Sequence, residues 1–336
     1  MQQTRRHCTI KQYNASLSGI FLKKLLNFLY LCIGISFFRA SQPRAFIQKL
    51  PAMKKILIPT DFSAHAENAG HYAVEFSRLF EAHITILHVY NLPPASVYPP
   101  LYSPGFPGKT LSMEEVQQIE KENEKRLQAF RDLICQGRLA HGCTLAQRSD
   151  FVSDGINDYA SENHVDLIVM GTRGSASRGE LFIATTTWDV ISSGKTAVLA
   201  IPENVPYKPI KHIAFATDFT EADFATMEFL TQMASKLEAQ LSVIHVKTDG
   251  GSLEENQMFD WFEEKTREQN PFPNMDFLML EHENVQEALN DFIHQNEVGM
   301  IALVNRKRQL FERLFHRSLT KKFAYHSDIP LLAFSD

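Results

Sequence analysis

The sequence predicts an α/β protein built from two tandem domains, each a five-stranded parallel sheet with helices on both faces. Two internal repeats and one alternating pattern predict it. Residues 54–89 recur without a gap at 211–246, with nine identities in 36 positions. Residues 165–201 recur at 298–334, with eight identities in 37. Short apolar runs alternate with helical periodicity in each copy, which requires crossover connections and hence parallel strands.

Local patterns predict each element of the first copy. The apolar run 54–60 is stopped by Pro59, Thr60 and Asp61, which is typical of a buried parallel strand. Asp61 or Ser63 can cap the next helix, which is expected to reach about Phe80, because a short side-chain oxygen satisfies the free amides of a first turn. The other expected elements are strand 84–90, helix 113–136, strand 143–150, helix 153–163, strand 166–171, helix 181–193 and strand 197–201.

The second copy predicts the same order of strands, joined by helices. Domain 1 is expected to span 53–202, domain 2 to span 210–336, and 203–209 to be the linker. The last strand of each copy is apolar and would leave an exposed sheet edge. We therefore expect these two strands to pair and join the domains as an intramolecular pseudo-dimer. Association of two whole chains into a homodimer stays open. The expected strands of the second copy are 211–217, 241–247, 275–281, 299–304 and 329–334.

The first copy carries an insertion that the second lacks, because the two repeat offsets differ by 24 residues. Residues 91–112 hold six prolines, which forbid a regular helix or a central strand, so a long loop is expected there. Tyr98, Tyr102 and Phe106 alternate with those prolines. This loop is either a lid or partner-docking segment or a tolerated insertion.

Residues 1–52 differ in composition from the rest of the chain. They contain eight Lys or Arg and no Asp or Glu, and their apolar run, 25–38, is shorter than the roughly 20 residues of a membrane-spanning helix. Met53 directly precedes the first predicted strand. We therefore expect a non-core extension, explained either by a start codon assigned too far upstream or by a targeting or anchoring segment.

Charge and cysteine content narrow the function classes. Residues 53–336 carry 26 basic and 39 acidic side chains, which argues against nucleic-acid binding through bulk charge. Cys8, Cys32, Cys135 and Cys143 show no metal-ligand spacing. A reduced, cytoplasmic setting is expected.

Two motifs are expected to meet at one edge of the first sheet. Asp61 follows the first strand, and Met170-Gly171-Thr172-Arg173-Gly174 ends the fourth. In Rossmann-like domains, ligands bind beyond the carboxyl ends of the strands, where strand order reverses. Nine residues after Gly174 the chain reads Ala184-Thr185. Over residues 53–336 it resembles the universal stress protein family in its tandem form, whose nucleotide-binding members carry that acid and a Gly-x2-Gly-x9-Gly-Ser/Thr signature.

The resemblance implies that domain 1 binds ATP or a related adenine nucleotide. Asp61 would contact the ribose or adenine end, and Val89 would line the base pocket. Glycines permit positive φ and close approach to a phosphate, while helix amides and the hydroxyls of Thr185 and Thr186 offer donors. Ala184 stands where the signature has its third glycine. An alanine there costs little free energy if its φ is negative, and roughly 1 kcal/mol or more if its φ is positive. The candidate set is Pro59, Thr60, Asp61, Val89, Met170, Gly171, Arg173, Gly174, Ala184, Thr185 and Thr186.

A purely structural interpretation of these residues is also open. Asp61 can be a helix cap only, and Gly171 and Gly174 can be turn formers only. Domain 2 is degenerate, because Val304 and Lys307 replace the two leading glycines and Arg317-Ser318 stands where Gly-Ser belongs, so no conventional site is expected there. The basic residues around 306–322 either hold an anion or acidic partner or form a charged helix face.

No catalytic or metal site is predicted. His88 and His245 occupy equivalent strand positions among apolar neighbours, which is typical of hydrogen-bonded core histidines. No nucleophile, base and orienting acid share a known spacing. The first hypothesis is a non-enzymatic stress-response module that binds a nucleotide, and the alternative is a nucleotide-free scaffold that acts through protein contacts. A slow ATP hydrolase ranks third.

Overall fold

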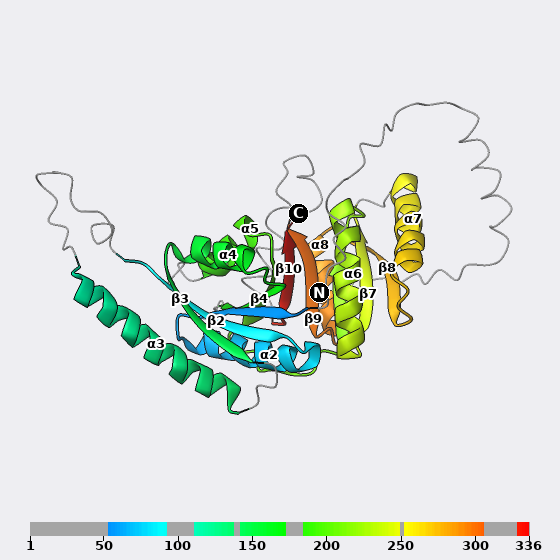
Figure 1. Ribbon diagram of the computed structural model, residues 1–336. Helices are drawn as coiled ribbons and strands as arrows, with labels where there is room; N and C mark the ends of the chain where they lie inside the picture. The colour runs from blue at the N-terminus through cyan, green and yellow to red at the C-terminus, as the bar shows by residue number, and fades with distance from the viewer. Residues whose placement is uncertain are drawn as a thin grey trace, which may run out of the picture.

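The computed structural model describes residues 53–92, 111–137, 142–172, 184–248, 252–305 and 328–335. The first repeat forms nine elements that alternate between strands and helices (Figure 1). They are β1 (Lys55–Pro59), α2 (Ala64–Phe80), β2 (His83–Tyr90), α3 (Met113–Cys135), β3 (Cys143–Ser149), α4 (Val152–Glu162), β4 (Leu167–Thr172), α5 (Ala184–Ser193) and β5 (Ala197–Pro202).

The second repeat follows the same plan over its described residues. Its elements are β6 (His212–Ala216), α6 (Glu221–Leu237), β7 (Gln240–Lys247), α7 (Leu253–Gln269), β8 (Met275–Glu281), α8 (Val285–Gln295), β9 (Met300–Asn305) and β10 (Leu331–Ser335). The predicted α/β class, with parallel five-stranded units in tandem, is confirmed.

All ten described strands join one sheet in the order β3-β2-β1-β4-β5-β10-β9-β6-β7-β8. Within each repeat the neighbouring strands are parallel; β1, for example, pairs with β2 on one side and β4 on the other. The chain leaves β1 toward β2 and later returns to the opposite side of β1. Strand order therefore reverses between β1 and β4, which is where open α/β sheets bind ligands.

The two repeats are joined through their last strands, as the sequence predicts. β5 and β10 run antiparallel, with Leu332 opposite Leu199. Each strand thereby covers the apolar edge of the other. α2 also holds the segment after β5, because Asn68 Nδ2 donates to the backbone oxygen of Val205 at 2.9 Å and Tyr72 Oη donates to that of Pro206 at 3.2 Å.

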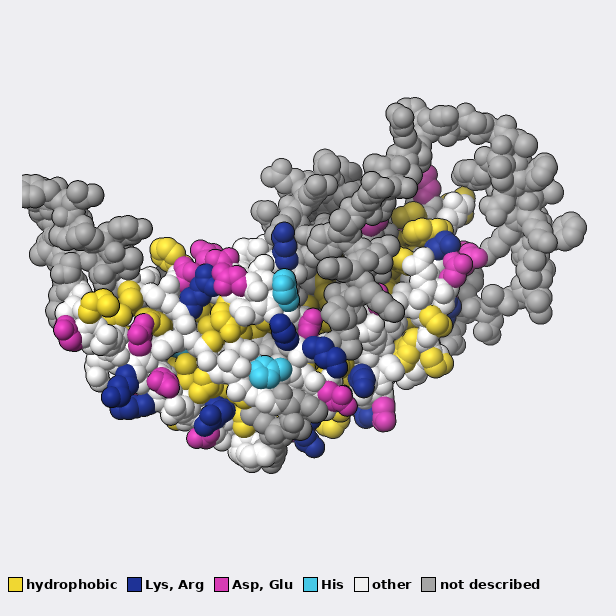
Figure 2. Space-filling model, in the orientation of Figure 1, with side chains coloured by type: hydrophobic (Ala, Val, Ile, Leu, Met, Phe, Trp, Pro, Cys, Tyr) yellow, Lys and Arg dark blue, Asp and Glu magenta, His cyan; other side chains and the backbone are white. Residues whose placement is uncertain are grey.

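Two apolar layers cover the sheet. On one face α2, α3, α6 and α7 bury side chains such as Phe76, Phe130 and Phe262. On the other face α4, α5 and α8 bury Ile156, Val190 and Phe292. Figure 2 shows acidic and basic side chains interspersed over the face in view. The exclusion of nucleic acid as a partner stays a prediction.

Several sequence predictions concern residues that the structure does not describe. These are the extension 1–52, most of the proline-rich loop and the basic region after Asn305. Among the helices within the described ranges, none has the length and apolar character needed to span a membrane. The cytoplasmic location stays a prediction.

Candidate functional site

The described candidate residues that precede residue 173 lie at the carboxyl ends of β1, β2 and β4. Pro59 is the last residue of β1, and the Thr60 amide extends the ladder by donating to the Leu87 oxygen at 2.9 Å. Gly171 is the penultimate residue of β4, which pairs with β1 in parallel. The structure thus brings Asp61 and Gly171 to the same edge of the sheet, at the point where strand order reverses.

Asp61 is exposed and holds the start of α2 through Ser63. Its Oδ1 accepts hydrogen bonds from the Ser63 amide at 3.0 Å and from the Ser63 hydroxyl. Ser63 is the N-cap, and its hydroxyl accepts from the Ala66 amide at 3.4 Å. Asp61 Oδ2 has no hydrogen-bond partner among the described residues. One carboxylate oxygen therefore organises the helix start, and the other faces outward as an acceptor.

The absence of a side chain at Gly171 allows α2 to pack closely against β4. A Cβ at this position would lie 2.3 Å from the backbone oxygen of His65 in the first turn of α2. Gly171 does not have positive φ; among the described glycines only Gly137 and Gly142 do. Gly171 therefore does not use the positive φ that glycine permits, and its missing side chain makes room for a helix.

Val89 and Met170 form the apolar floor beneath this edge. Each is 7% exposed, and both belong to the layer under α4 and α5. Gly155 of α4 lies against Val89, since a Cβ there would be 2.8 Å from Val89 Cγ1. Gly155 was not among the predicted site residues, because nothing local in the sequence links α4 to the end of β2.

The amino end of α5 lies beside the tip of β4. Its first residue is Ala184, so the backbone there is helical and φ is negative, which means that alanine costs little at this position. Thr187 donates from Oγ1 to the Gly171 oxygen at 3.2 Å and is 2% exposed. Sequence reasoning missed Thr187, although it continues the threonine run 185–187. Arg173 and Gly174 lie outside the described residues, as do the side chains of Ala184 and Thr185.

His88, in β2, holds the carboxyl end of β1 in place. Its Nδ1 donates to the Thr60 oxygen at 2.8 Å, and its ring lies 4.5 Å from that of Phe62, which has a φ of 66°. Arg126 of α3 stacks over Phe62 at 4.0 Å. Burial lowers the pKa of His88, and the Arg126 charge lowers it further. This neutral, backbone-bonded ring agrees with the predicted structural role, while Arg126 was not predicted.

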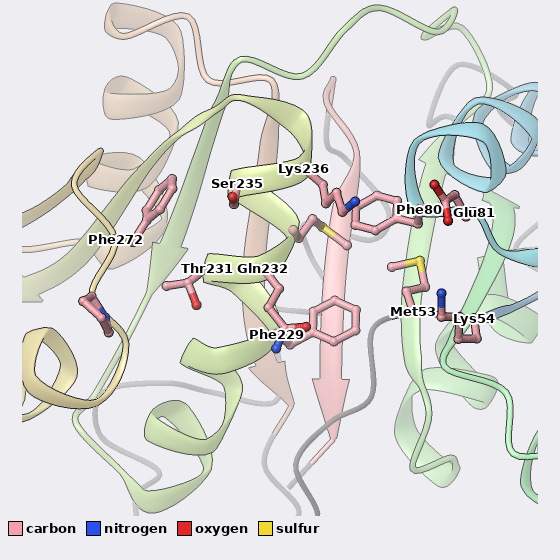
Figure 3. A pocket seen from close by; sticks show the side chains of 12 residues that line it. Met53, Lys54, Phe80, Glu81, Phe229, Thr231, Gln232, Ser235, Lys236 and Phe272 are labelled. Carbon is pink, nitrogen blue, oxygen red and sulfur yellow. The ribbon is translucent and has the colours of Figure 1, made fainter.

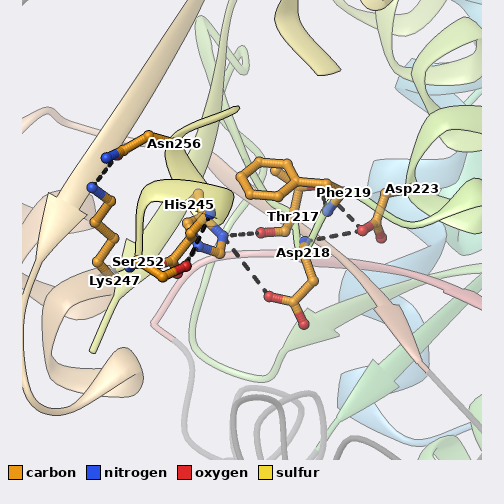
Figure 4. Close-up of polar contacts among 9 residues, drawn as sticks. Thr217, Asp218, Phe219, Asp223, His245, Lys247, Ser252 and Asn256 are labelled. Atoms are coloured by element: carbon orange, nitrogen blue, oxygen red, sulfur yellow. Dashed lines mark hydrogen bonds and ion pairs between the residues drawn. The ribbon is translucent and has the colours of Figure 1, made fainter. Parts of the chain in front are cut away.

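The matching region of the second repeat is occupied by its own side chains (Figure 4). His245 Nδ1 lies 2.8 Å from the Thr217 oxygen, and Nε2 lies 2.7 Å from Glu255 Oε1 of α7. The ring therefore links the loop after β6 to α7. Lys247 bonds to Asn256, also of α7. α7 thereby closes over the strand ends.

A buried carboxylate completes this closure. Asp223 is 0% exposed and its Oδ2 accepts from Thr217 Oγ1 at 3.1 Å and from the Asp218 amide at 3.0 Å. The first repeat has Ala66 at the equivalent position. Val304 stands where β4 has Gly171, and its side chain packs against the core. The loss of a conventional nucleotide site in domain 2 stays a prediction.

A separate pocket lies at the opposite edge of the sheet. It has a volume of about 450 Å³ and is lined by residues that precede strands, including Lys54, Phe80, Lys236 and Phe272 (Figure 3). It is therefore remote from Asp61. Within the described ranges, no group of three or more His, Cys, Asp or Glu side chains could hold a metal ion.

Comparisons with known proteins agree with this architecture. The family model described as "Universal stress protein family" matches residues 53–202 and 209–335. The universal stress protein MJ0577 of Methanocaldococcus jannaschii is 27% identical over 167 residues, covering 44% of this chain and 94% of that protein. A universal stress protein of Thermus aquaticus is 26% identical over 150 residues, covering 44% and 98%. Each of these relatives corresponds in extent to less than half of this chain.

A solved structure extends the likeness to both repeats. A universal stress protein from Archaeoglobus fulgidus superposes with a TM-score of 0.63 at 16% identity, covering 84% of this chain and 98% of that one. A putative universal stress protein from Pseudomonas aeruginosa gives 0.53 at 10% identity, covering 85% and 95%. At these identities the structures show the fold alone. With both segments of the chain matched by the family model, the chain belongs to the universal stress protein family, in its tandem two-domain form.

Proposed function

We propose that the first repeat binds ATP or a related adenine nucleotide at the edge formed by β1, β4 and α5. The protein then acts as a non-catalytic stress-response module, in which the bound nucleotide changes the shape of the protein or its affinity for a partner. The observation that carries the proposal is the contrast between the repeats. Asp61 keeps one outward carboxylate oxygen, whereas the equivalent region of domain 2 is bridged by the His245–Glu255 pair.

The described groups suit the two ends of a nucleotide. A carboxylate beyond the first strand can accept hydrogen bonds from ribose hydroxyls, as in dinucleotide-binding folds. The amino end of α5, beginning at Ala184, offers free amides and the positive end of the helix dipole to a phosphate. Val89 and Met170 supply an apolar floor for a base. These contacts bind a ligand, but amides and hydroxyls alone do not activate a water, so hydrolysis is not proposed.

The alternative is a nucleotide-free scaffold, which a different observation favours. Large apolar side chains are exposed on α7 and before α4: Leu253 is 74% exposed, Trp261 50% and Phe151 67%. Contiguous exposed apolar side chains are typical of protein contact surfaces, and Leu253 and Trp261 lie on the same helix. The alternative predicts that the affinity for a protein partner does not change when a nucleotide is added.

Calorimetry of the full-length chain with ATP and AMP separates these hypotheses. Asp61→Ala is expected to weaken binding about tenfold or more, because a hydrogen bond to a charged group contributes roughly 1.5–3 kcal/mol. Asp218→Ala is the matched control in the second repeat and should leave the affinity unchanged. Thermal melting of both variants checks that they are folded.

Two results would remove the nucleotide hypothesis. One is the absence of binding heat with the natural sequence. The other is equal loss in the Asp61 and Asp218 variants. Steady phosphate release from ATP that Asp61→Ala abolishes would instead support the enzyme.

A further inference from the structure

The α6 groove, which is the pocket shown in Figure 3, lies at the junction of the two repeats. Its lining includes Met53 and Phe80 of the first repeat and Phe229, Gln232 and Lys236 of α6. Phe80 and Phe229 point toward the space between α2 and α6. The volume of about 450 Å³ falls within the roughly 300–1,000 Å³ of ligand pockets. A ligand in this groove would contact both repeats.

The repeat offset of 157 residues gives this groove an equivalent on α2. Tyr72 of α2 stands at the position that Phe229 has in α6. There the ring of Tyr207 packs edge-on against Tyr72, with 5.1 Å between the ring centroids. Tyr207 belongs to the linker 203–209, which runs between β5 and β6 and packs against the core. The chain's own linker therefore covers the equivalent of Phe229.

Side-chain donors of α2 hold the backbone of this linker. Asn68 Nδ2 donates to the Val205 oxygen at 2.9 Å, and Tyr72 Oη donates to the Pro206 oxygen at 3.2 Å. Pro206 directly precedes Tyr207, and a proline favours an extended backbone around itself. The equivalent groove thus shows what it accepts: an aromatic ring that follows a proline, with the neighbouring carbonyl oxygens hydrogen-bonded to side chains of the helix.

The α6 groove offers different donors for the same purpose. Ala225 and Phe229 stand at the positions of Asn68 and Tyr72, and neither side chain can donate a hydrogen bond. The lining instead contributes two lysines, Lys54 and Lys236.

Both lysines are available to a ligand. Across the described part of the chain, the Nζ atoms of Lys54 and Lys236 form no hydrogen bond or ion pair. Lys211, the equivalent of Lys54 in the second repeat, is instead used internally, because its Nζ donates to the Leu237 oxygen at 3.2 Å. Glu81 is the acid among the lining residues, so the groove does not require a strongly charged ligand.

We propose that the α6 groove binds an extended segment of a partner protein in which an aromatic side chain follows a proline. The ring packs against Phe80 and Phe229, as that of Tyr207 packs against Tyr72, and the two lysines donate to the carbonyl oxygens of the segment. Proline restricts the free segment in advance, which lowers the entropy lost on binding. The groove lies at the sheet edge opposite Asp61, so the proposal does not depend on nucleotide binding.

Fluorescence anisotropy of a labelled peptide tests the proposal on the full-length chain. The probe is the peptide Glu-Asn-Val-Pro-Tyr-Lys-Pro, which has the sequence of residues 203–209. We expect saturable binding. The same peptide with alanine in place of tyrosine should bind at least about tenfold more weakly, because loss of a buried aromatic anchor removes a large share of the binding energy of an interface.

Variants of the protein locate the binding at the groove. Gln232→Trp, at an exposed lining position, should fill the groove and weaken binding at least about tenfold. Lys54→Ala should weaken binding about threefold, the effect of one lost hydrogen bond. Lys211→Ala is the matched control in the second repeat and should leave the affinity unchanged. Thermal melting checks that each variant is folded.

Three results would overturn the proposal. One is the absence of saturable binding to the full-length chain, which would leave the groove to a second copy or to another part of this chain. The second is equal affinity for the tyrosine and alanine peptides. The third is an affinity that Gln232→Trp does not change.

Discussion

The Gly171→Ala variant is expected to lose about 3 kcal/mol of unfolding free energy, the upper end of the usual range for overpacking. The new Cβ would lie 2.3 Å from the His65 backbone oxygen and 2.5 Å from its carbonyl carbon. Both belong to the main chain of α2, so no side-chain rotation relieves the clash. α2 would have to move off β4. Urea denaturation followed by circular dichroism measures the loss.

Gly299→Ala is the matched control. Gly299 precedes β9, and a Cβ there would meet Ile210 Cγ2 at 3.4 Å, which the side chain can accommodate with a small shift. The expected change is below about 1 kcal/mol. An equally small effect at both positions would contradict the packing role assigned to Gly171.

The second large effect is expected at His245. Removing this side chain with His245→Ala leaves Glu255 without its partner at 2.7 Å and opens a cavity beside Phe219. Removing one partner of a largely buried hydrogen bond to a carboxylate costs about 1.5–3 kcal/mol, and the 19% exposure of the Glu255 side chain places the loss below the top of that range. The loss should be visible in urea denaturation as an earlier transition of domain 2.

The duplication supplies a control for this experiment. His88 occupies the equivalent strand position, but only its Nδ1 is bonded, to the Thr60 oxygen, and no carboxylate partner lies at Nε2 among the described residues. His88→Ala is therefore expected to cost less than His245→Ala. Similar losses in the two variants would mean that the contact with Glu255 contributes nothing, and the closure of domain 2 would need another explanation.

The sequence predicts the elements well because their signals are local. The strand predicted at 84–90 is β2, which spans His83–Tyr90, and the helix predicted to end at about Phe80 ends there. The pairing of the terminal strands was also predictable, since two apolar strands without partners must cover each other. The described part of α5 begins at Ala184, and the first three residues of the helix predicted at 181–193 lie outside the described residues.

Contacts between elements distant in the sequence were less predictable. The glycine at 171 was predicted from a motif, but its packing against His65 depends on how α2 crosses β4. Arg126, Gly155 and Glu255 reach the strand ends from helices whose positions follow from the assembled sheet. Local composition does not encode those positions. That the second repeat lacks a conventional site stays a prediction, and the residues that bridge its strand ends could not be named from the sequence.

The divergence of the two repeats can be traced to a few substitutions. Asp223 replaces Ala66 and binds the loop after β6, and Val304 replaces Gly171 at the end of the matching strand. With Glu255 brought in by α7, both ring nitrogens of His245 are hydrogen-bonded within the second repeat. In the first repeat, Asp61 Oδ2 has no hydrogen-bond partner among the described residues. We propose that one repeat kept a nucleotide site and that side chains of the other repeat filled the equivalent region.

A crystal structure of the full-length chain grown with ATP tests this claim most directly. The claim predicts one nucleotide per chain, with its ribose or adenine beside Asp61 and its phosphates at the amino end of α5. The His245–Glu255 contact should persist in the same crystal. A nucleotide bound beside Asp218 in the second repeat, or a first repeat left empty at saturating ATP, would contradict it.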